Sequence, residues 1–127
     1  MDSPRIKKTD QALSERANLA DYGNVRAGFS WEQATGVLAG LPNNQGINLG
    51  YETVDRHVDE GRGDRAALVF VDKAFESRTV TFDELSRTSN RFANVLGGIS
   101  LEPGDAVFAL SGRHPLLYAA ALGTWKY

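Results

Sequence analysis

The chain has 127 residues, with 14 Lys or Arg against 16 Asp or Glu, so its formal net charge is −2 and its length suits about one ordinary domain. This balance argues against a dedicated nucleic-acid binder, which would normally carry a basic stripe. The lack of cysteine excludes a disulfide scaffold, a thiolate zinc site, an iron–sulfur cluster and a cysteine nucleophile.

No stretch of the sequence has the pattern of a membrane span or a secretory signal. The longest uncharged window, residues 33–51, contains Pro42 and several Asn and Gln side chains that would be costly in hydrocarbon. The N-terminal segment MDSPRIKKTDQ lacks an apolar core. We therefore expect a cytoplasmic protein without a membrane or nucleic-acid partner.

Residues 1–28 are predicted to be a polar lead-in that wraps onto another part of the protein. Ser, Asp, Asn and Gly are scattered through them, and a short helix is favoured only within residues 10–20. There Leu13, Ala17 and Ala20 fall on one side. The range 29–127 is expected to hold the structured part of the chain.

A helix is predicted to begin at Ser30, which can cap it, with Gln33 at the capping-box position. Its apolar stripe consists of Trp31, Ala34, Leu38 and Leu41. Gly36 and Gly40 weaken it by about 1 kcal/mol each relative to alanine. Turn chemistry makes residues 42–46 a loop.

A second helix is predicted from an Asn48 cap through about Glu60, with Gly61 at the position of a left-handed C-cap. Its apolar residues are Tyr51, Val54 and Val58. Two strands follow, residues 66–71 and 78–81, and the polar linker between them has the length of a hairpin turn.

The clearest helix start is the capping box of residues 81–84, in which Thr81 and Glu84 satisfy each other's backbone N–H groups. Apolar residues then recur at helical spacing until Gly97 and Gly98 end the helix. They are Leu85, Phe92, Val95 and Leu96.

The last predicted elements are a tight turn at residues 102–105, a buried strand at 106–110 and a helix at 116–125 opened by Pro115. Strand, turn and helix make the first half of a βαβ unit whose completing parallel strand is not among the 127 residues. The fold class is therefore predicted to be α/β, with a chain that ends inside a βαβ unit.

Two groups of side chains are candidates for sites of chemistry. Ser111 and His114 follow the predicted strand, where α/β proteins place ligand groups, but no nucleophile elbow surrounds the serine. A polar turn with one of them near the helix N-terminus is the favoured interpretation.

A carboxylate–histidine metal site could be suspected at His57, which has acidic residues on both sides. They are Asp55, Asp59 and Glu60. The neighbouring arginines and the lack of a second histidine favour a solvated helical face with local ion pairs instead. Residues 61–64 contain G-x-G, but they follow a helix and lack the later glycine of a dinucleotide cradle.

The sequence from residue 80 onward resembles the adenylate-forming superfamily. Residues 80–85 (VTFDEL) are similar to its first core motif, (L/V)-(T/S)-(Y/F)-x-E-L, and residues 90–96 (NRFANVL) to its N-R-x-A-N-x-L helix. The segments PGD, VFAL, HP and AALGTWK follow in the family's order. Upstream, FSW, GINL and YETVDRH resemble the N-terminal region of acetyl-CoA synthetases, the acetate–CoA ligases.

The resemblance implies that the parent enzyme activates a carboxylate, with acetate favoured, through Mg-ATP to an acyl-adenylate and passes the acyl group to CoA. The family's phosphate loop, acidic residues and C-terminal lysine lie downstream of the matched stretch. Residues 29–127 are thus expected to be an incomplete N-terminal part of the large domain, with the remainder of its own polypeptide as partner.

ATP, CoA and Mg²⁺ are accordingly expected to serve the parent enzyme and not to be bound by residues evident here. No residue of the chain is assigned a catalytic, cofactor-binding or metal-ligating role, and the chain alone is expected to be inactive. Two alternatives stay open. One is a ligase for propionate or another short or medium-chain acid, and the other is a stand-alone, non-enzymatic α/β module that binds a partner through its apolar C-terminal helix.

Overall fold

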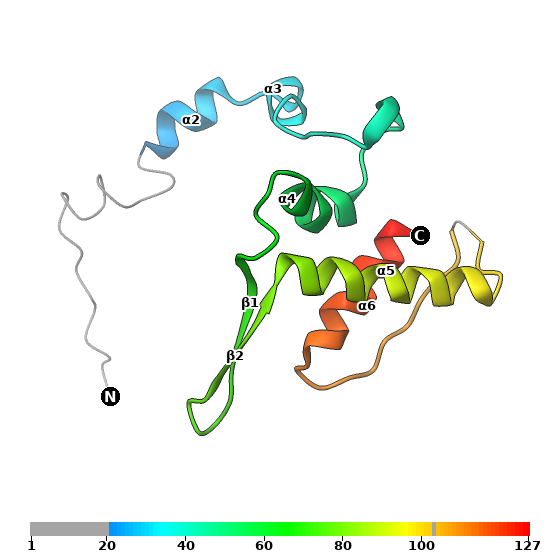
Figure 1. Ribbon diagram of the computed structural model, residues 1–127. Helices are drawn as coiled ribbons and strands as arrows, with labels where there is room; N and C mark the ends of the chain where they lie inside the picture. Colours follow the sequence, from blue (N-terminus) through cyan, green and yellow to red (C-terminus); the bar gives the residue numbers. More distant parts are fainter. Residues whose placement is uncertain (1–20, 103) are drawn as a thin grey trace, which may run out of the picture. The chain divides into compact units, whose positions relative to one another are not determined.

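The computed structural model describes residues 21–102 and 104–127 (Figure 1). The chain divides into two units, with the boundary between Val37 and Leu38. The helix predicted within residues 10–20 lies outside the described residues. Across the described ranges, no helix has the length and apolar character needed to cross a bilayer.

The described part of the first unit holds two short helices, α2 (Tyr22–Gly28) and α3 (Trp31–Thr35). Asp21 caps α2, because its side chain accepts from the Asn24 N–H at 3.0 Å. No helix was predicted at this position in the polar lead-in. Ser30 caps α3 as predicted, with its Oγ 3.1 Å from the Gln33 N. The helix was expected to continue to residue 41 but ends at Gly36, consistent with the low helix propensity of glycine.

The second unit starts with a loop and a capped helical segment. The loop contains the short turn η1 (Pro42–Asn44), in which Asn43 and Asn44 adopt positive φ. The helical segment consists of a wide turn, η2 (Tyr51–Asp55), followed by α4 (Arg56–Asp59). Its predicted ends are confirmed, because the Asn48 side chain accepts from the Tyr51 N–H and Gly61 has a φ of +75°.

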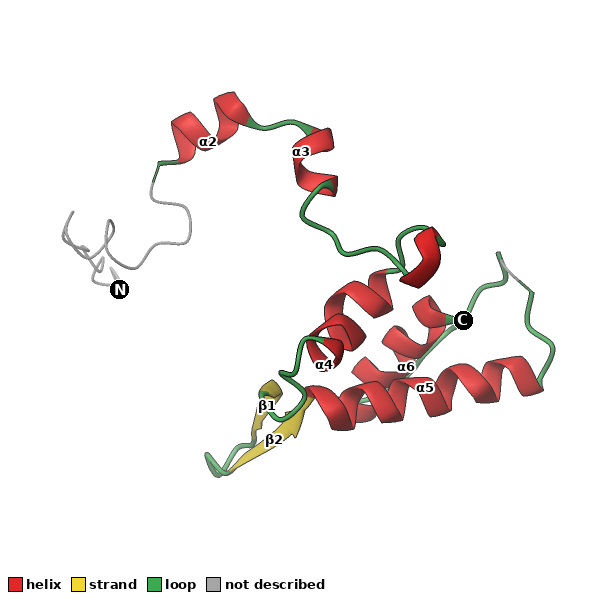
Figure 2. Cartoon of the chain, turned by 45° about the horizontal axis from the view of Figure 1, so that its top comes forward, coloured by secondary structure: helices red, strands yellow, loops and turns green. Residues whose placement is uncertain are grey.

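Two antiparallel strands form a hairpin, as the sequence predicted. Strand β1 (Ala66–Val71) pairs with β2 (Ser77–Thr81) in a register that places Leu68 opposite Val80. At the turn, Asp72 Oδ1 accepts from the backbone N–H groups of Ala74 and Glu76. Strand β2 leads directly into the longest helix (Figure 2).

The long helices α5 (Phe82–Gly98) and α6 (Pro115–Lys126) lie side by side. The predicted capping box at the start of α5 is present in both directions, with Glu84 N donating to Thr81 Oγ1 at 3.2 Å and Thr81 N donating to Glu84 Oε2 at 3.1 Å. Pro115 occupies the first turn of α6, as predicted.

A small apolar core joins the helical segment, the hairpin and the two long helices. Its buried side chains are Val54, Val80, Leu85, Ala119 and Leu122. Partly buried apolar residues of β1 and the start of α5 pack against them. The predicted mixture of helices and strands is thereby confirmed.

The predicted buried strand at residues 106–110 is not formed. The segment runs back from the end of α5 to the start of α6 outside any sheet, and Phe108 is 94% exposed. Its sequence is apolar throughout, but a strand requires a neighbouring strand to satisfy its backbone N–H and C=O groups. Within the described residues the sheet consists of β1 and β2 alone.

Candidate functional site

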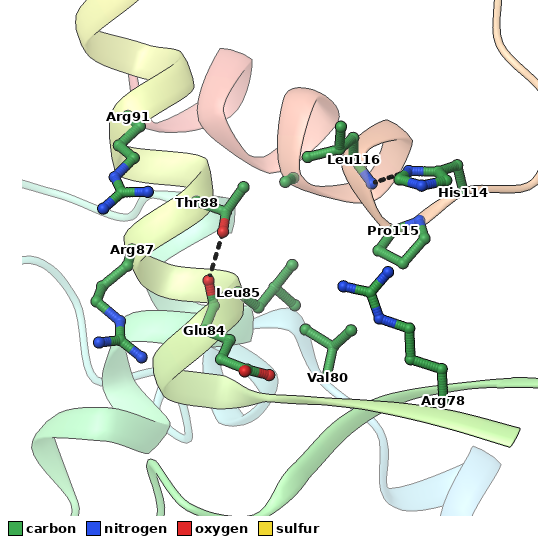
Figure 3. A pocket seen from close by; sticks show the side chains of 11 residues that line it. Arg78, Val80, Glu84, Leu85, Arg87, Thr88, Arg91, His114, Pro115 and Leu116 are labelled. Carbon is green, nitrogen blue, oxygen red and sulfur yellow. Dashed lines mark hydrogen bonds between the residues drawn. The ribbon is translucent and has the colours of Figure 1, made fainter.

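A cavity of about 260 Å³ opens between β2, α5 and the start of α6 (Figure 3). Its apolar lining comes from Val80, Leu85, Pro115, Leu116 and Ala119. Its polar lining consists of Arg78, Glu84, Arg87, Thr88, Arg91 and His114.

The polar groups of this cavity do not assemble a reactive centre. Arg87 and Arg91 project from one side of α5, whereas Arg78 points toward Pro115 (Figure 3). The Glu84 carboxylate is engaged in the capping box, and the Thr88 hydroxyl donates to the Glu84 carbonyl oxygen at 2.7 Å. No nucleophile paired with a base faces the cavity among these lining residues.

Ser111 and His114 lie in a polar turn before α6, as predicted. His114 Nδ1 accepts from the Leu116 N–H at 3.2 Å and so caps α6, while Ser111 Oγ donates to the Gly112 carbonyl oxygen at 3.1 Å. The two side chains are engaged in separate local contacts. Their role in this arrangement is to end one segment and begin the next helix.

Asp55 belongs to a polar contact between three elements and not to a solvated helical face, which corrects the interpretation from the sequence. Its Oδ1 accepts from Ser86 Oγ of α5 at 2.6 Å and from Lys126 Nζ of α6 at 2.7 Å. Lys126 also donates to Asn90 Oδ1 at 2.8 Å, and its side chain is only 8% exposed. Because both charges are largely removed from water, each depends on the other for compensation.

Arg56, the next residue, forms the local ion pairs that the sequence predicted. Its guanidinium contacts Glu60 at 2.9 Å and Glu52 at 3.1 Å, both at i±4 spacing. The hydrogen bond from Arg56 holds the pKa of Glu60 below its ordinary value. The hydrogen bonds to Glu60 and Glu52 raise the pKa of Arg56 above its ordinary value.

Glu52 ties this helical segment to the preceding loop. Its carboxylate accepts from the backbone N–H of Gly40 at 2.6 Å and of Ala39 at 3.2 Å. Burial of Glu52 opposes its ionisation, but the hydrogen bonds from Gly40, Ala39 and Arg56 outweigh that effect and lower its pKa. The carboxylate is therefore a structural acceptor, well supplied with donors.

His57 is also occupied by its neighbours. Arg62 Nη2 lies 2.6 Å from His57 Nδ1, and since a guanidinium can only donate, that ring nitrogen accepts. The imidazole packs on the Phe82 ring with centroids 4.5 Å apart. Nowhere in residues 21–102 and 104–127 do three His, Cys, Asp or Glu side chains gather as a metal centre would require.

A larger, apolar groove of about 700 Å³ lies between α5, the extended segment and α6. Its apolar walls include Phe92 and Val95 from α5, Val107 and Phe108 from the extended segment, and Leu117 and Trp125 from α6. Arg91 is the charged residue of its lining. Such a surface suits the burial of apolar groups more than polar chemistry.

Two glycines that no local sequence pattern marked as contact residues allow α6 to approach its neighbours closely. A Cβ atom on Gly123 of α6 would lie 2.5 Å from the Ser89 carbonyl oxygen of α5, and one on Gly50, before η2, would lie 3.0 Å from the Leu122 carbonyl oxygen of α6. For Gly123, the signal in the sequence is a glycine inside an otherwise apolar helix.

Known proteins that are similar in sequence cover most of this chain. The sequence profile described as "AMP-binding enzyme" matches residues 54–127. The chain is 34% identical to an acetyl-coenzyme A synthetase of Bacillus subtilis (strain 168) over 116 residues, which are 91% of this chain and 20% of that protein. No solved structure matches the chain significantly.

Shorter regions are similar to two further proteins of the same description. Identity is 44% over 62 residues to the acetyl-coenzyme A synthetase of Rubrobacter xylanophilus, covering 48% of this chain and 10% of that protein. Identity to the acetyl-coenzyme A synthetase of Xanthobacter autotrophicus is 46% over 61 residues, which are 47% of this chain and 9% of that protein. The chain thus spans about a fifth or less of the length of these curated relatives.

Proposed function

The chain belongs to the AMP-binding enzyme family, and from this premise we propose that it is the N-terminal part of an acid–thiol ligase that makes acetyl-CoA from acetate, ATP and CoA through an acyl-adenylate. The observation that carries the proposal is the alignment with the Bacillus subtilis acetyl-coenzyme A synthetase over 91% of the chain. Its α/β fold of helices with a two-stranded sheet is consistent with the N-terminal portion of such a domain.

The motifs that carry the resemblance have structural roles in this chain. Thr81 and Glu84, the hydroxyl and carboxylate positions of the first core motif, form the capping box of α5. In the D-R-H element, Asp55 binds Lys126 and Ser86, Arg56 binds two glutamates, and His57 packs on Phe82. These contacts support the proposal that residues 29–127 form an incomplete part of the large domain and carry no catalytic group.

ATP, CoA and Mg²⁺ are proposed as requirements of the parent enzyme. The described residues do not fit a Mg²⁺ centre, since the carboxylates that lie near one another are paired with Arg56, Arg62 or Lys126. Arg78, Arg87 and Arg91, which line the 260 Å³ cavity, do not point toward a common position where a phosphate could bind. No reaction step is therefore assigned to a residue of this chain, and the chain alone should not form acetyl-adenylate.

The cytoplasm is the proposed location, and acetate is the proposed substrate. Propionate or another short or medium-chain acid is the alternative, because the groups that surround the acid are expected outside the aligned region. Thioester formation from a panel of acids by the full-length parent tests this choice. A higher kcat/KM for acetate than for propionate supports the proposal, and the reverse order contradicts it.

A stand-alone interaction module is the second candidate, favoured by the exposed apolar groove along α6. Determining the coding sequence that follows the Tyr127 codon separates the two functions. An open frame that reaches a Gly/Ser/Thr-rich phosphate loop supports the ligase. A stop codon at that position supports the module and overturns the proposal.

A further inference from the structure

We propose that Glu52 acts as a removable latch on the loop of residues 38–47. Its carboxylate fills an anion site formed by the backbone N–H groups of Ala39 and Gly40 and the guanidinium of Arg56. Release of the carboxylate frees this loop while the core of the second unit stays folded. The latch is independent of the proposed ligase function, because that function assigns no role to Glu52 or to the loop.

Two successive backbone amides and one cation form the anion site. Gly40 N donates to Glu52 Oε1 at 2.6 Å, and Ala39 N donates to Oε2 of the same carboxylate at 3.2 Å. Arg56 Nη1 lies 3.1 Å from Oε2. Gly40 has a φ of +72°, a left-handed conformation that glycine adopts at little cost. Successive N–H groups that converge in this way make a concavity that binds anions.

Glu52 occupies this site in place of a dissolved anion. Its side chain is only 6% exposed, and both of its carboxylate oxygens have donors. Residues 38–47 contain no charged or titratable side chain, so the charge that faces Glu52 comes from Arg56 of α4. The adjacent titratable group, the Tyr51 hydroxyl, donates to Asp59 instead.

The loop is suited to local release because it contributes no side chain to the apolar core. The core side chains come from residues 54–122, whereas those of residues 38–47 are exposed or half-buried. The Leu41 N–H donates to the Gly46 carbonyl oxygen at 2.7 Å, so the loop also closes on itself. Loss of the Glu52 contacts therefore opens no apolar interface. Since the loop starts at the boundary of the two units, the latch acts on the segment that connects them.

Protonation of Glu52 opens the latch. Burial raises the pKa of this carboxyl, but the hydrogen bonds from Gly40, Ala39 and Arg56 lower it by more, so the net shift is downward. The carboxylate is therefore charged and the latch is closed at neutral pH. As pH falls through the lowered pKa, the carboxylate loses its charge and the loop is released.

Amide hydrogen exchange of the unmodified 127-residue chain tests this release. The protection factors of the Ala39 and Gly40 amides should fall once the pH is below the ordinary range of a glutamate, while the amides of Leu96 and Leu122 inside the long helices keep theirs. Simultaneous loss at all four amides would show global unfolding and overturn the latch.

Glu52→Ala and Glu60→Ala form a matched pair at neutral pH, because both glutamates contact the Arg56 guanidinium. Glu52→Ala should reduce the protection of the Ala39 and Gly40 amides by roughly tenfold to a hundredfold, the effect of losing charge-assisted hydrogen bonds. Glu60→Ala should leave it unchanged, since Glu60 accepts from Arg56 and Arg62 and not from the loop. Equal losses in the two variants would refute the specific role of Glu52.

Added acetate gives a readout that a general loss of stability would not produce. Glu52→Ala deletes one methylene and the carboxylate, which are the atoms that acetate supplies. Acetate should restore the protection of the Ala39 and Gly40 amides in this variant, whereas acetamide, its neutral isostere, should not. In the unmodified chain acetate should change neither amide, because Glu52 already occupies the site. Equal restoration by acetamide, or none by acetate in the folded variant, would overturn the anion site. If Glu52→Ala does not fold, the pH titration of the unmodified chain decides between the two outcomes.

Discussion

Replacing Gly123 by alanine should force α5 and α6 apart at their closest point. The added Cβ would meet the Ser89 carbonyl oxygen at 2.5 Å, whereas ordinary van der Waals contact begins at 3.4 Å. It would also meet Phe92 Cβ at 3.0 Å and the Ala93 nitrogen at 3.1 Å. Two of these three neighbours are backbone atoms, so rotation of a side chain cannot relieve the overlap.

The expected net effect is a loss of about 1–2 kcal/mol in the free energy of unfolding. Overpacking at such a contact costs about 2–3 kcal/mol, and the better helix propensity of alanine returns about 1 kcal/mol. Urea unfolding followed by far-ultraviolet circular dichroism measures the change.

Gly98→Ala is the matched control, because a Cβ there meets nothing within 4 Å at the end of α5. It should stabilise the chain by about 0.5 kcal/mol, since alanine has less backbone entropy to lose than glycine. If Gly123→Ala were as stable as the unmodified chain while Gly98→Ala behaved as expected, the close crossing of the two helices would be refuted.

Three further changes probe the caps and the charged contacts, each by urea unfolding. Thr81→Ala should cost about 1 kcal/mol because the Glu84 N–H loses its acceptor, and no loss would contradict the capping box. Glu52→Gln should flatten the dependence of the free energy of unfolding on pH in the acid range. The pKa of Glu52 is lowered in the folded state, so its contribution to stability is complete above the ordinary value of about 4.5 and is lost as pH falls through the folded value. An unchanged pH profile would contradict this role of Glu52. Asp55→Ala should cost about 2 kcal/mol, and the double variant with Lys126→Met should recover part of it, whereas strict additivity would refute their coupling.

The helix starts could be predicted from the sequence because capping depends on residues three positions apart. Ser30, Asn48 and Thr81 each accept from the backbone N–H that the sequence pattern indicates, and Pro115 opens α6. The helix α2 was missed although Asp21 caps it in the same way, since its short sequence YGNVRAG has no apolar stripe.

The long-range features could not be derived from local patterns. Residues 106–110 have the composition of a strand, but whether a strand forms depends on a neighbour that this chain does not place beside them. Asp55 and Lys126 are 71 residues apart, so their ion pair follows from the packing of α6 and not from spacing along the chain. The same holds for the contact between Gly123 and Ser89.

The most direct test of the central proposal is the acetate-dependent exchange of labelled pyrophosphate into ATP. It is measured on the 127-residue chain alone and on a hybrid in which residues 29–127 replace the aligned region of the Bacillus subtilis acetyl-coenzyme A synthetase. We expect exchange by the hybrid and none by the chain alone. Robust exchange by the chain alone, or a folded hybrid that activates neither acetate nor propionate, would contradict it.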